Sequence, residues 1–151
     1  MLALDQIDRA LLRALAQDAT QSASALGRKL GLSQPATWRR LKRLRDAGAI
    51  ARQHVDLDLP ALGLGVTVFL GISLAAKGRV SLADFERAVM AIPEVQTVQH
   101  VLGLYDYRLR VVARDLSDFE RVLRRRIMTL PGVGAVDANV LLSEERLPGP
   151  L

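Results

Sequence analysis

A strand–helix–strand pattern that occurs twice is the feature that most constrains the fold of this chain. Each copy places a helix with one apolar stripe between two short strands. Each helix ends at a proline that leads into a strand starting with valine, at Pro93–Val95 and at Pro131–Val133. This order predicts a ferredoxin-like βαββαβ domain, an antiparallel sheet with both helices on one face. The expected strands are 66–74, 95–101, 105–113 and 133–142, and the expected helices are 81–92, starting at Ser81, and 117–130, starting with a Ser117/Glu120 capping box.

The first third of the chain predicts three short helices. Asp5 is placed to cap the first helix, with Asp8 in capping-box position. The second helix starts at Ser22 or Ser24 and stops at Gly31, where glycine permits a left-handed residue. Ser33 caps the third helix, which carries Pro35 in its first turn and ends near Gly48. Two helices joined by a short turn with glycine are typical of a helix-turn-helix, whose second helix enters the major groove of DNA.

The positive charge of the chain is concentrated in this part. The formal net charge is +5, and residues 1–50 hold nine Lys or Arg and four Asp or Glu, so the remaining residues are neutral as a group. This asymmetry predicts a module that binds a polyanion beside a neutral partner domain, with double-stranded DNA as the partner.

The periodicity of the third helix separates an inner face from an outer face. Thr37, Leu41 and Leu44 share the inner face. Three basic residues lie opposite and are expected to contact phosphates, and three residues near the helix start are expected to reach base edges. Two alternatives stay open: the charged run is only a solvated face, and Trp38 lies in a core or dimer interface. The expected DNA-binding residues are Ser33, Gln34, Trp38, Arg39, Lys42 and Arg43.

The segment that follows alternates loosely over residues 50–58 and predicts a short strand, placed as the wing of a winged helix-turn-helix would be. Arg52 and His54 would then lie near phosphates, although a plain linking strand fits the same pattern. Glycine and proline make residues 59–65 the linker. The expected organisation is α+β, with a DNA-binding domain at 1–58 and an oligomerisation domain at 66–151.

A second protomer is the expected cover for the open face of the sheet. Phe69 and the valine and leucine content of the strands favour this cover over water. A homodimer also supplies the two-fold symmetry with which helix-turn-helix proteins bind paired half-sites.

Composition excludes several classes of site. The chain has no cysteine, and its two histidines, His54 and His100, show no metal-ligand spacing, so neither a metal site nor a cofactor is expected. No apolar run approaches the roughly 20 residues that span a bilayer, and the first residues do not resemble a signal peptide. A cytoplasmic protein without a membrane partner is expected.

Taken in order, these motifs resemble the leucine-responsive/asparagine-synthesis regulator (Lrp/AsnC) family of bacterial and archaeal transcription factors. The resemblance implies a transcriptional regulator rather than an enzyme, dimeric through the sheet domain and commonly assembled into tetramers or octamers. One departure is Arg45, because family members commonly carry an acidic residue there. The segments that carry the resemblance are Leu4–Asp8, Leu30–Ser33, Arg39–Leu44, Gly48–Ile50, Gly103–Tyr107 and Leu130–Val133.

The resemblance also implies an amino-acid effector, bound where the turn between two strands meets a neighbouring dimer. Gly103 would let the backbone approach the ligand, and Asp106 would pair with an α-ammonium group. The alternative is that Gly103 and Asp106 only stabilise a turn. Leu104 is apolar where family members often carry a polar residue, which leaves the identity of the effector open. The residues at matching positions are Gly103, Leu104, Tyr105, Asp106, Leu116 and Val140.

Two other functions fit parts of the pattern. A haem-biosynthesis decarboxylase of related architecture would need a histidine or tyrosine acid, and the chain offers only His54, His100, Tyr105 and Tyr107. An architectural protein that compacts DNA with little sequence preference would also suit a strongly basic helix.

Overall fold

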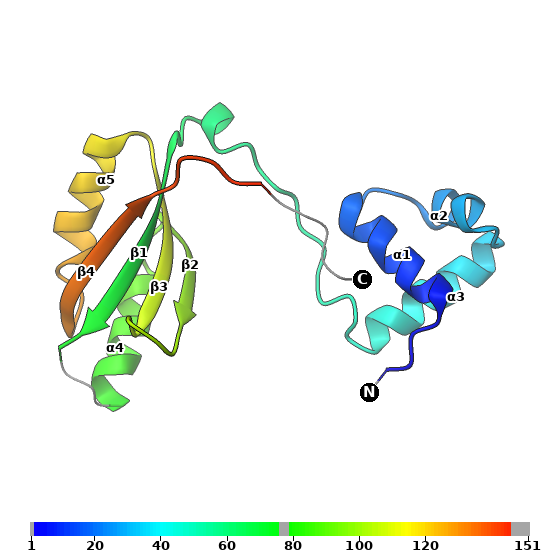
Figure 1. The fold of residues 1–151 in the computed structure, drawn as a ribbon, viewed down its shortest axis with the longest axis horizontal. Coiled ribbons are helices and arrows are strands. Elements are labelled where there is room, and N and C mark those ends of the chain that lie inside the picture. The colour runs from blue at the N-terminus through cyan, green and yellow to red at the C-terminus, as the bar shows by residue number, and fades with distance from the viewer. Residues whose placement is uncertain (1, 76–78, 146–151) are drawn as a thin grey trace. The chain divides into compact units, whose positions relative to one another are not determined.

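The structure is a computed structural model that describes residues 2–75 and 79–145. The chain divides into two compact units, the first extending to Asp56 and the second comprising Leu57–Glu144 (Figure 1). Residues 146–151 of the expected second domain lie outside the described residues. In the described part of the chain, no helix is both long and apolar enough to cross a membrane.

The first unit contains three helices, α1 (Gln6–Gln17), α2 (Ala23–Leu30) and α3 (Gln34–Asp46). Asp5 and Asp8 form the expected capping box of α1, and the hydroxyls of Ser22 and Ser33 accept backbone N–H groups at the starts of α2 and α3. Gly31 ends α2 in the left-handed conformation, with φ 67°. The helices pack around Leu11, Leu26 and Leu41.

The strand expected at 50–58 is wrong, because residues 51–58 form neither helix nor strand. A strand requires a hydrogen-bonded neighbour, and the described part of the first unit contains no strand to pair with. Instead Gln53 donates its side-chain amide to the Ala19 carbonyl at 3.3 Å, and a single 3-10 turn, η1 (Pro60–Leu62), follows.

The second unit contains the expected antiparallel sheet, formed by β1 (Val66–Leu74), β2 (Val95–His100), β3 (Tyr107–Ala113) and β4 (Val133–Val140). The strand order is β2-β3-β1-β4, so β1 lies between β3 and β4 and the two edges are β2 and β4. Leu70 lies opposite Leu109 of β3 and Ala138 of β4.

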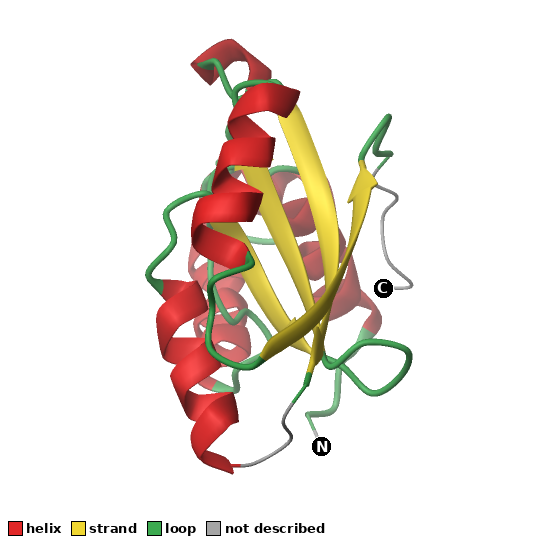
Figure 2. Cartoon of the chain, turned by 90° about the vertical axis from the view of Figure 1, so that its left-hand side faces the viewer, coloured by secondary structure: helices red, strands yellow, loops and turns green. Residues whose placement is uncertain are grey.

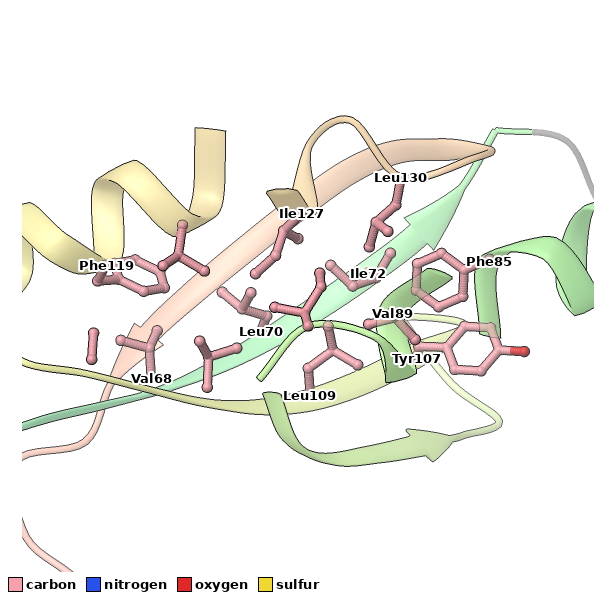
Figure 3. Packing of buried hydrophobic residues seen from close by; sticks show 14 of the residues in the cluster. Val68, Leu70, Ile72, Phe85, Val89, Tyr107, Leu109, Phe119, Ile127 and Leu130 are labelled. Atoms are coloured by element: carbon pink, nitrogen blue, oxygen red, sulfur yellow. The ribbon is translucent and has the colours of Figure 1, made fainter. Parts of the chain in front are cut away.

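Helices α4 (Arg79–Met90) and α5 (Leu116–Val122) cover one face of this sheet, and a π-helical turn, η2 (Leu123–Ile127), extends α5 (Figure 2). The core lies between the helices and this face (Figure 3). Leucine, isoleucine and valine of β1 and β3 meet Phe85, Val89, Phe119 and Ile127 of the helices there. The opposite face of the sheet, called the open face below, carries no helix of the second unit (Figure 2).

Several element ends differ from expectation. The third strand begins at Tyr107 rather than at residue 105, because Asp106 is held in the preceding turn. The expected Ser117 cap is wrong: Asp115 caps α5 by accepting the Asp118 N–H at 2.7 Å. Helix α4 already begins at Arg79, and the side chain of Ser81 lies outside the described residues. The turn η2 has no sequence signal of its own and was missed.

Candidate functional site

The angle between α2 and α3 depends on a close backbone approach at Gly27. This glycine is buried, and a Cβ added to it would lie 2.7 Å from the Leu32 carbonyl oxygen and 2.8 Å from the Thr37 hydroxyl oxygen. Thr37 is itself buried and donates its hydroxyl to the Ser33 carbonyl at 3.0 Å. The turn therefore holds α3 in a fixed orientation against α2.

The two faces of α3 are divided as its periodicity predicts. Thr37, Leu41 and Leu44 are buried, whereas Gln34, Arg39 and Lys42 are exposed. Trp38 is 53% exposed, so it is not a core residue of its own unit. The Trp38 ring and the Gln34 amide are thus exposed near the start of α3. The exposed cations Arg39 and Lys42 follow them along the helix.

Asp8 is the partner of two cations on α3. Its side chain is almost fully buried, and it pairs with Arg40, at 2.9 Å, and with Arg43. Arg40 also pairs with Asp5 at 2.6 Å. Burial opposes the charge of Asp8, but hydrogen bonds from Arg43, Arg40 and the Asp5 amide outweigh it and lower the pKa of this carboxyl. These pairs join the start of α1 to α3.

The cations of α3 therefore differ in availability. Arg43, expected to contact DNA, already pairs with Asp8, and Lys42 pairs with Asp46 at 2.7 Å across one helical turn. Among the described residues, neither Arg39 nor Arg45 forms an ion pair. Helical periodicity did not reveal the internal role of Arg40, although Asp8, an aspartate on the apolar stripe of α1, was a signal for a buried partner.

The turn between β2 and β3 is anchored on the end of β1. Asp106 donates its backbone N–H to the Ile72 carbonyl at 2.9 Å, and its carboxylate accepts the Leu74 N–H at 2.8 Å. Gly103 and Leu104 protrude from the turn, with Leu104 84% exposed. This carboxylate thus performs the turn-stabilising function that was the alternative to ligand binding, while the tip of the turn stays accessible.

Tyr105 lies flat on the open face of the sheet at the base of this turn. A Cβ added to Gly71 would lie 2.6 Å from the Tyr105 ring, so the ring occupies the space that glycine leaves. The Tyr105 hydroxyl donates to Asp137 of β4 at 2.7 Å, and this bond raises the pKa of Tyr105 and lowers that of Asp137. The turn is thereby attached to the central strand β1 and to the edge strand β4.

The remaining residues expected to bind an effector lie at the other end of the sheet. Val140 pairs with Val68, at the start of β1, and Leu116 starts α5 just after the end of β3. The turn contacts Ile72 and Leu74, four to six residues farther along β1, which is roughly 13–20 Å at strand spacing. One copy of the second unit therefore does not bring the six residues into a single pocket.

Comparison with known proteins identifies the family. An AsnC-type helix-turn-helix domain model matches residues 4–45, and an Lrp/AsnC ligand binding domain model matches residues 67–148. The chain belongs to the Lrp/AsnC family. The Bkd operon transcriptional regulator of Pseudomonas aeruginosa is 35% identical over 97% of this chain and 96% of its own length. The transcriptional regulator AzlB of Bacillus subtilis is 33% identical over 95% of this chain and 91% of its own length.

Solved Lrp/AsnC structures match the whole architecture. A transcriptional regulator of Neisseria meningitidis, solved as an L-Met complex, has a TM-score of 0.90 and 26% identity over 99% of this chain and 96% of its own. An AsnC family regulator of Agrobacterium tumefaciens has a TM-score of 0.86 and 30% identity over 98% and 96%. This Lrp/AsnC chain is a DNA-binding transcriptional regulator with a small-molecule-binding domain.

The four histidine and tyrosine residues that an enzyme would need are divided between the two units of this Lrp/AsnC chain. His54 belongs to the first unit, whereas the other three belong to the second. Burial and a 2.6 Å hydrogen bond to Glu86 raise the pKa of Tyr107 to about 12. His100 stacks on the Tyr107 ring at 4.8 Å between centroids. Among the described residues, no group of three or more acidic or histidine side chains could hold a metal ion.

Proposed function

We propose that the exposed face of α3 binds duplex DNA, with Gln34 and Trp38 at base edges, Ser33 at the helix start, and Arg39 and Lys42 on phosphates. The observation that carries this proposal is the division of α3, whose inner face is buried while Arg39 stays exposed without an ion pair in the described residues. Arg43 contributes to a phosphate contact with the guanidinium donors that Asp8 leaves unused. The protein regulates transcription in the cytoplasm and is not a catalyst.

The test compares two arginine variants of equal charge. Arg39→Ala is expected to weaken duplex binding on every sequence and to reduce the slope of log K against log salt by about 1, because one phosphate contact is lost. Arg87→Ala, in the second unit and paired with Asp84, is the matched control and leaves the slope unchanged. Equal slopes for both variants would contradict this face.

Sequence-specific regulation is favoured over DNA compaction because Gln34 and Trp38 are exposed where side chains of a recognition helix reach bases. Gln34→Ala is expected to cost about 1–3 kcal/mol on the preferred operator and almost nothing on random DNA. The ratio of the two dissociation constants measures this. A ratio near one in the unchanged protein would instead support compaction.

We also propose that the open face of the sheet is the homodimer interface, with tetramers or octamers assembled from dimers. Phe69 lies half-buried on this face beneath the Arg108 guanidinium, 4.7 Å from the ring centroid. The Arg110 Nε is buried without a hydrogen-bond partner, which is costly unless a second chain supplies an acceptor. Arginines of β3 and Asp137 of β4 would meet around a two-fold axis along the strands.

Light scattering after gel filtration tests the interface. Phe69→Glu is expected to shift the protein toward monomer, because a carboxylate would be buried between two sheets. Met90→Glu, on the outer side of α4 and 69% exposed, is the control and keeps the native mass. A dimer that survives Phe69→Glu would place the interface elsewhere.

An amino acid is the proposed effector, bound at the turn 103–106 where two dimers meet, with Leu116 and Val140 supplied by another chain. The separation of the turn from these two residues within one chain supports a site shared between chains. Thermal-shift screening against the twenty amino acids should find a ligand that raises the melting temperature. Leu104→Glu should abolish the shift without lowering the basal melting temperature, and an unchanged shift would contradict this site.

A further inference from the structure

A small pocket on the outer side of the second unit is lined by three arginines. Its volume is about 130 Å³, and Arg121, Val122, Arg125, Arg126 and Glu94 line it. It lies along α5 and η2, on the helix layer, and includes none of the residues assigned above to DNA, dimerisation or the effector. We call it the arginine pocket.

The spacing of the three arginines along the helix lets them share one pocket. Residues 121 and 125, and residues 122 and 126, are four positions apart, so these four side chains form one continuous patch of the helix surface. The Met128 N–H donates to the Leu123 carbonyl at 2.9 Å, five residues back, so the helix is widened by a π-helical turn at this patch. Such π-helical turns are frequent at functional sites.

Two carboxylates, Glu94 in the pocket lining and Asp118 beside it in α5, position two of the three guanidinium groups. Arg126 pairs with Glu94 at 2.9 Å, and Arg121 pairs with Asp118, whose pKa the Arg114 and Arg121 guanidinium groups lower. Each of these pairs uses only part of the five donors of a guanidinium group. Arg125 forms no ion pair in the described part of the chain, so the lining keeps an excess of positive charge and several free N–H donors.

We propose that the arginine pocket binds a phosphate group. Guanidinium forks match phosphate oxygens in bidentate geometry, and the excess positive charge suits a group with one to two negative charges. A pocket of about 130 Å³ has room for a phosphate group, and a larger molecule that carries the phosphate would extend beyond it. The remainder of the ligand, a small phosphorylated molecule or a nucleic-acid backbone, therefore lies outside the pocket.

Calorimetric titration of the full chain with inorganic phosphate, against sodium chloride at equal ionic strength, tests the site. Arg125→Ala is expected to weaken phosphate binding at least tenfold, because a charge-assisted bidentate contact is lost. Arg124→Ala is the matched control: it is the adjacent residue, has the same charge, pairs with Glu120 at 3.0 Å and does not line the pocket. Phosphate binding at any other site, including α3, should be the same in the two variants and therefore cannot produce a difference between them.

Arg125→Gln serves as a second variant, and the melting temperature of each variant without phosphate checks folding. The proposal is overturned if the Arg124 and Arg125 variants lose phosphate affinity equally, or if phosphate binds no more strongly than chloride. Selective loss in both Arg125 variants supports it. The titration does not involve DNA, so its failure is distinct from failure of the Arg39 experiment.

The source of the phosphate group follows from a second measurement. If the pocket holds a DNA backbone phosphate, Arg125→Ala reduces the salt slope of duplex binding by about 1, while Arg124→Ala does not. If the salt slopes are equal while phosphate binding is selectively lost, the ligand is a small phosphorylated molecule. Both results support the pocket, because selective phosphate binding is required first.

Discussion

The two units of this chain are stabilised in different ways. Among the described residues, the core cluster of the second unit has fifteen buried residues, all apolar except for the Tyr107 hydroxyl, whereas the core cluster of the first unit has three buried leucines. The first unit adds a buried carboxylate, Asp8, which pairs with two arginines of α3. A small DNA-binding unit with little apolar surface thus depends on charge pairs to position its recognition helix, while the sheet unit depends on its core.

The largest expected effect comes from equal truncations in the two cores. Leu11→Ala and Leu109→Ala, both at fully buried positions, should each lower the free energy of unfolding by about 2–5 kcal/mol. The first unit is smaller and is therefore expected to have the lower free energy of unfolding. Leu11→Ala should unfold it at 25 °C, whereas Leu109→Ala should leave the second unit folded with a lower melting temperature.

The chain carries separate probes for this experiment. Its single tryptophan, Trp38, lies in the first unit, and both tyrosines lie in the second. Trp38 fluorescence and tyrosine near-UV circular dichroism therefore follow the two units independently. Equal residual order in both variants would show that the difference in core size does not determine their stability.

A smaller effect is expected from Asp8→Asn, which removes the charge but keeps the side-chain shape. The Arg40 and Arg43 side chains are 29% and 48% exposed, so water compensates for part of the loss, and we expect about 2 kcal/mol in the Trp38 transition. Asp84→Asn removes an exposed pair with Arg87 and should change the tyrosine transition very little. Similar changes in the free energy of unfolding for the two variants would mean that the burial of Asp8 does not strengthen its ion pairs.

The two units should also differ in their stability toward acid. The pKa of Asp8 is lowered in the folded state, so its stabilising contribution is present above the unfolded-state pKa of about 4 and is lost as the pH falls through the folded-state value. Asp118 follows the same direction in the second unit, but the large apolar core there does not titrate. We expect the Trp38 transition to occur at higher pH than the tyrosine transition, and Asp8→Asn to flatten its pH dependence. Coincident acid transitions would argue against this difference.

The sequence was sufficient for those parts of the fold that follow from local pattern. The caps at Asp5 and Ser33 and the stop at Gly31 were predicted because each depends on residues within a few positions, and Ser22 was one of the two expected starts of α2. The doubled strand–helix–strand order likewise predicted the antiparallel sheet of the second unit.

The features that were missed depend on contacts distant in sequence or on other chains. Alternation over 50–58 could not reveal that the described residues of the first unit include no strand with which this segment could pair. The pairing of Arg43 with Asp8 joins residues 35 positions apart, so Arg43 could not be distinguished from Arg39 by periodicity alone. The arginine pocket is completed by Glu94, which pairs with Arg126 across 32 positions of the sequence, so helical spacing alone did not reveal it.

The smallest expected effect compares one glycine in each unit. At Gly27 an added methyl group would meet the Leu32 carbonyl, which is backbone, so α2 and α3 must separate. At Gly71 its nearest neighbour would be the ring of Tyr105, a side chain that can shift more easily than backbone. Allowing for the better helix propensity of alanine, we expect Gly27→Ala to lower the stability of the first unit by about 1–2 kcal/mol and Gly71→Ala to lower that of the second by about 1 kcal/mol or less.

Their functional consequences should differ more than their stabilities. Gly27→Ala changes the orientation of α3 and should weaken operator binding, whereas Gly71→Ala displaces Tyr105 from Asp137 and should alter only the response to effector. Gly103→Ala, where an added methyl group meets no atom within 4 Å, is the control for DNA binding only, because Gly103 belongs to the turn proposed to bind the effector. If Gly71→Ala weakened DNA binding without effector as much as Gly27→Ala does, the recognition helix would depend on the turn of the second unit, and the two units could not be treated as separately stabilised.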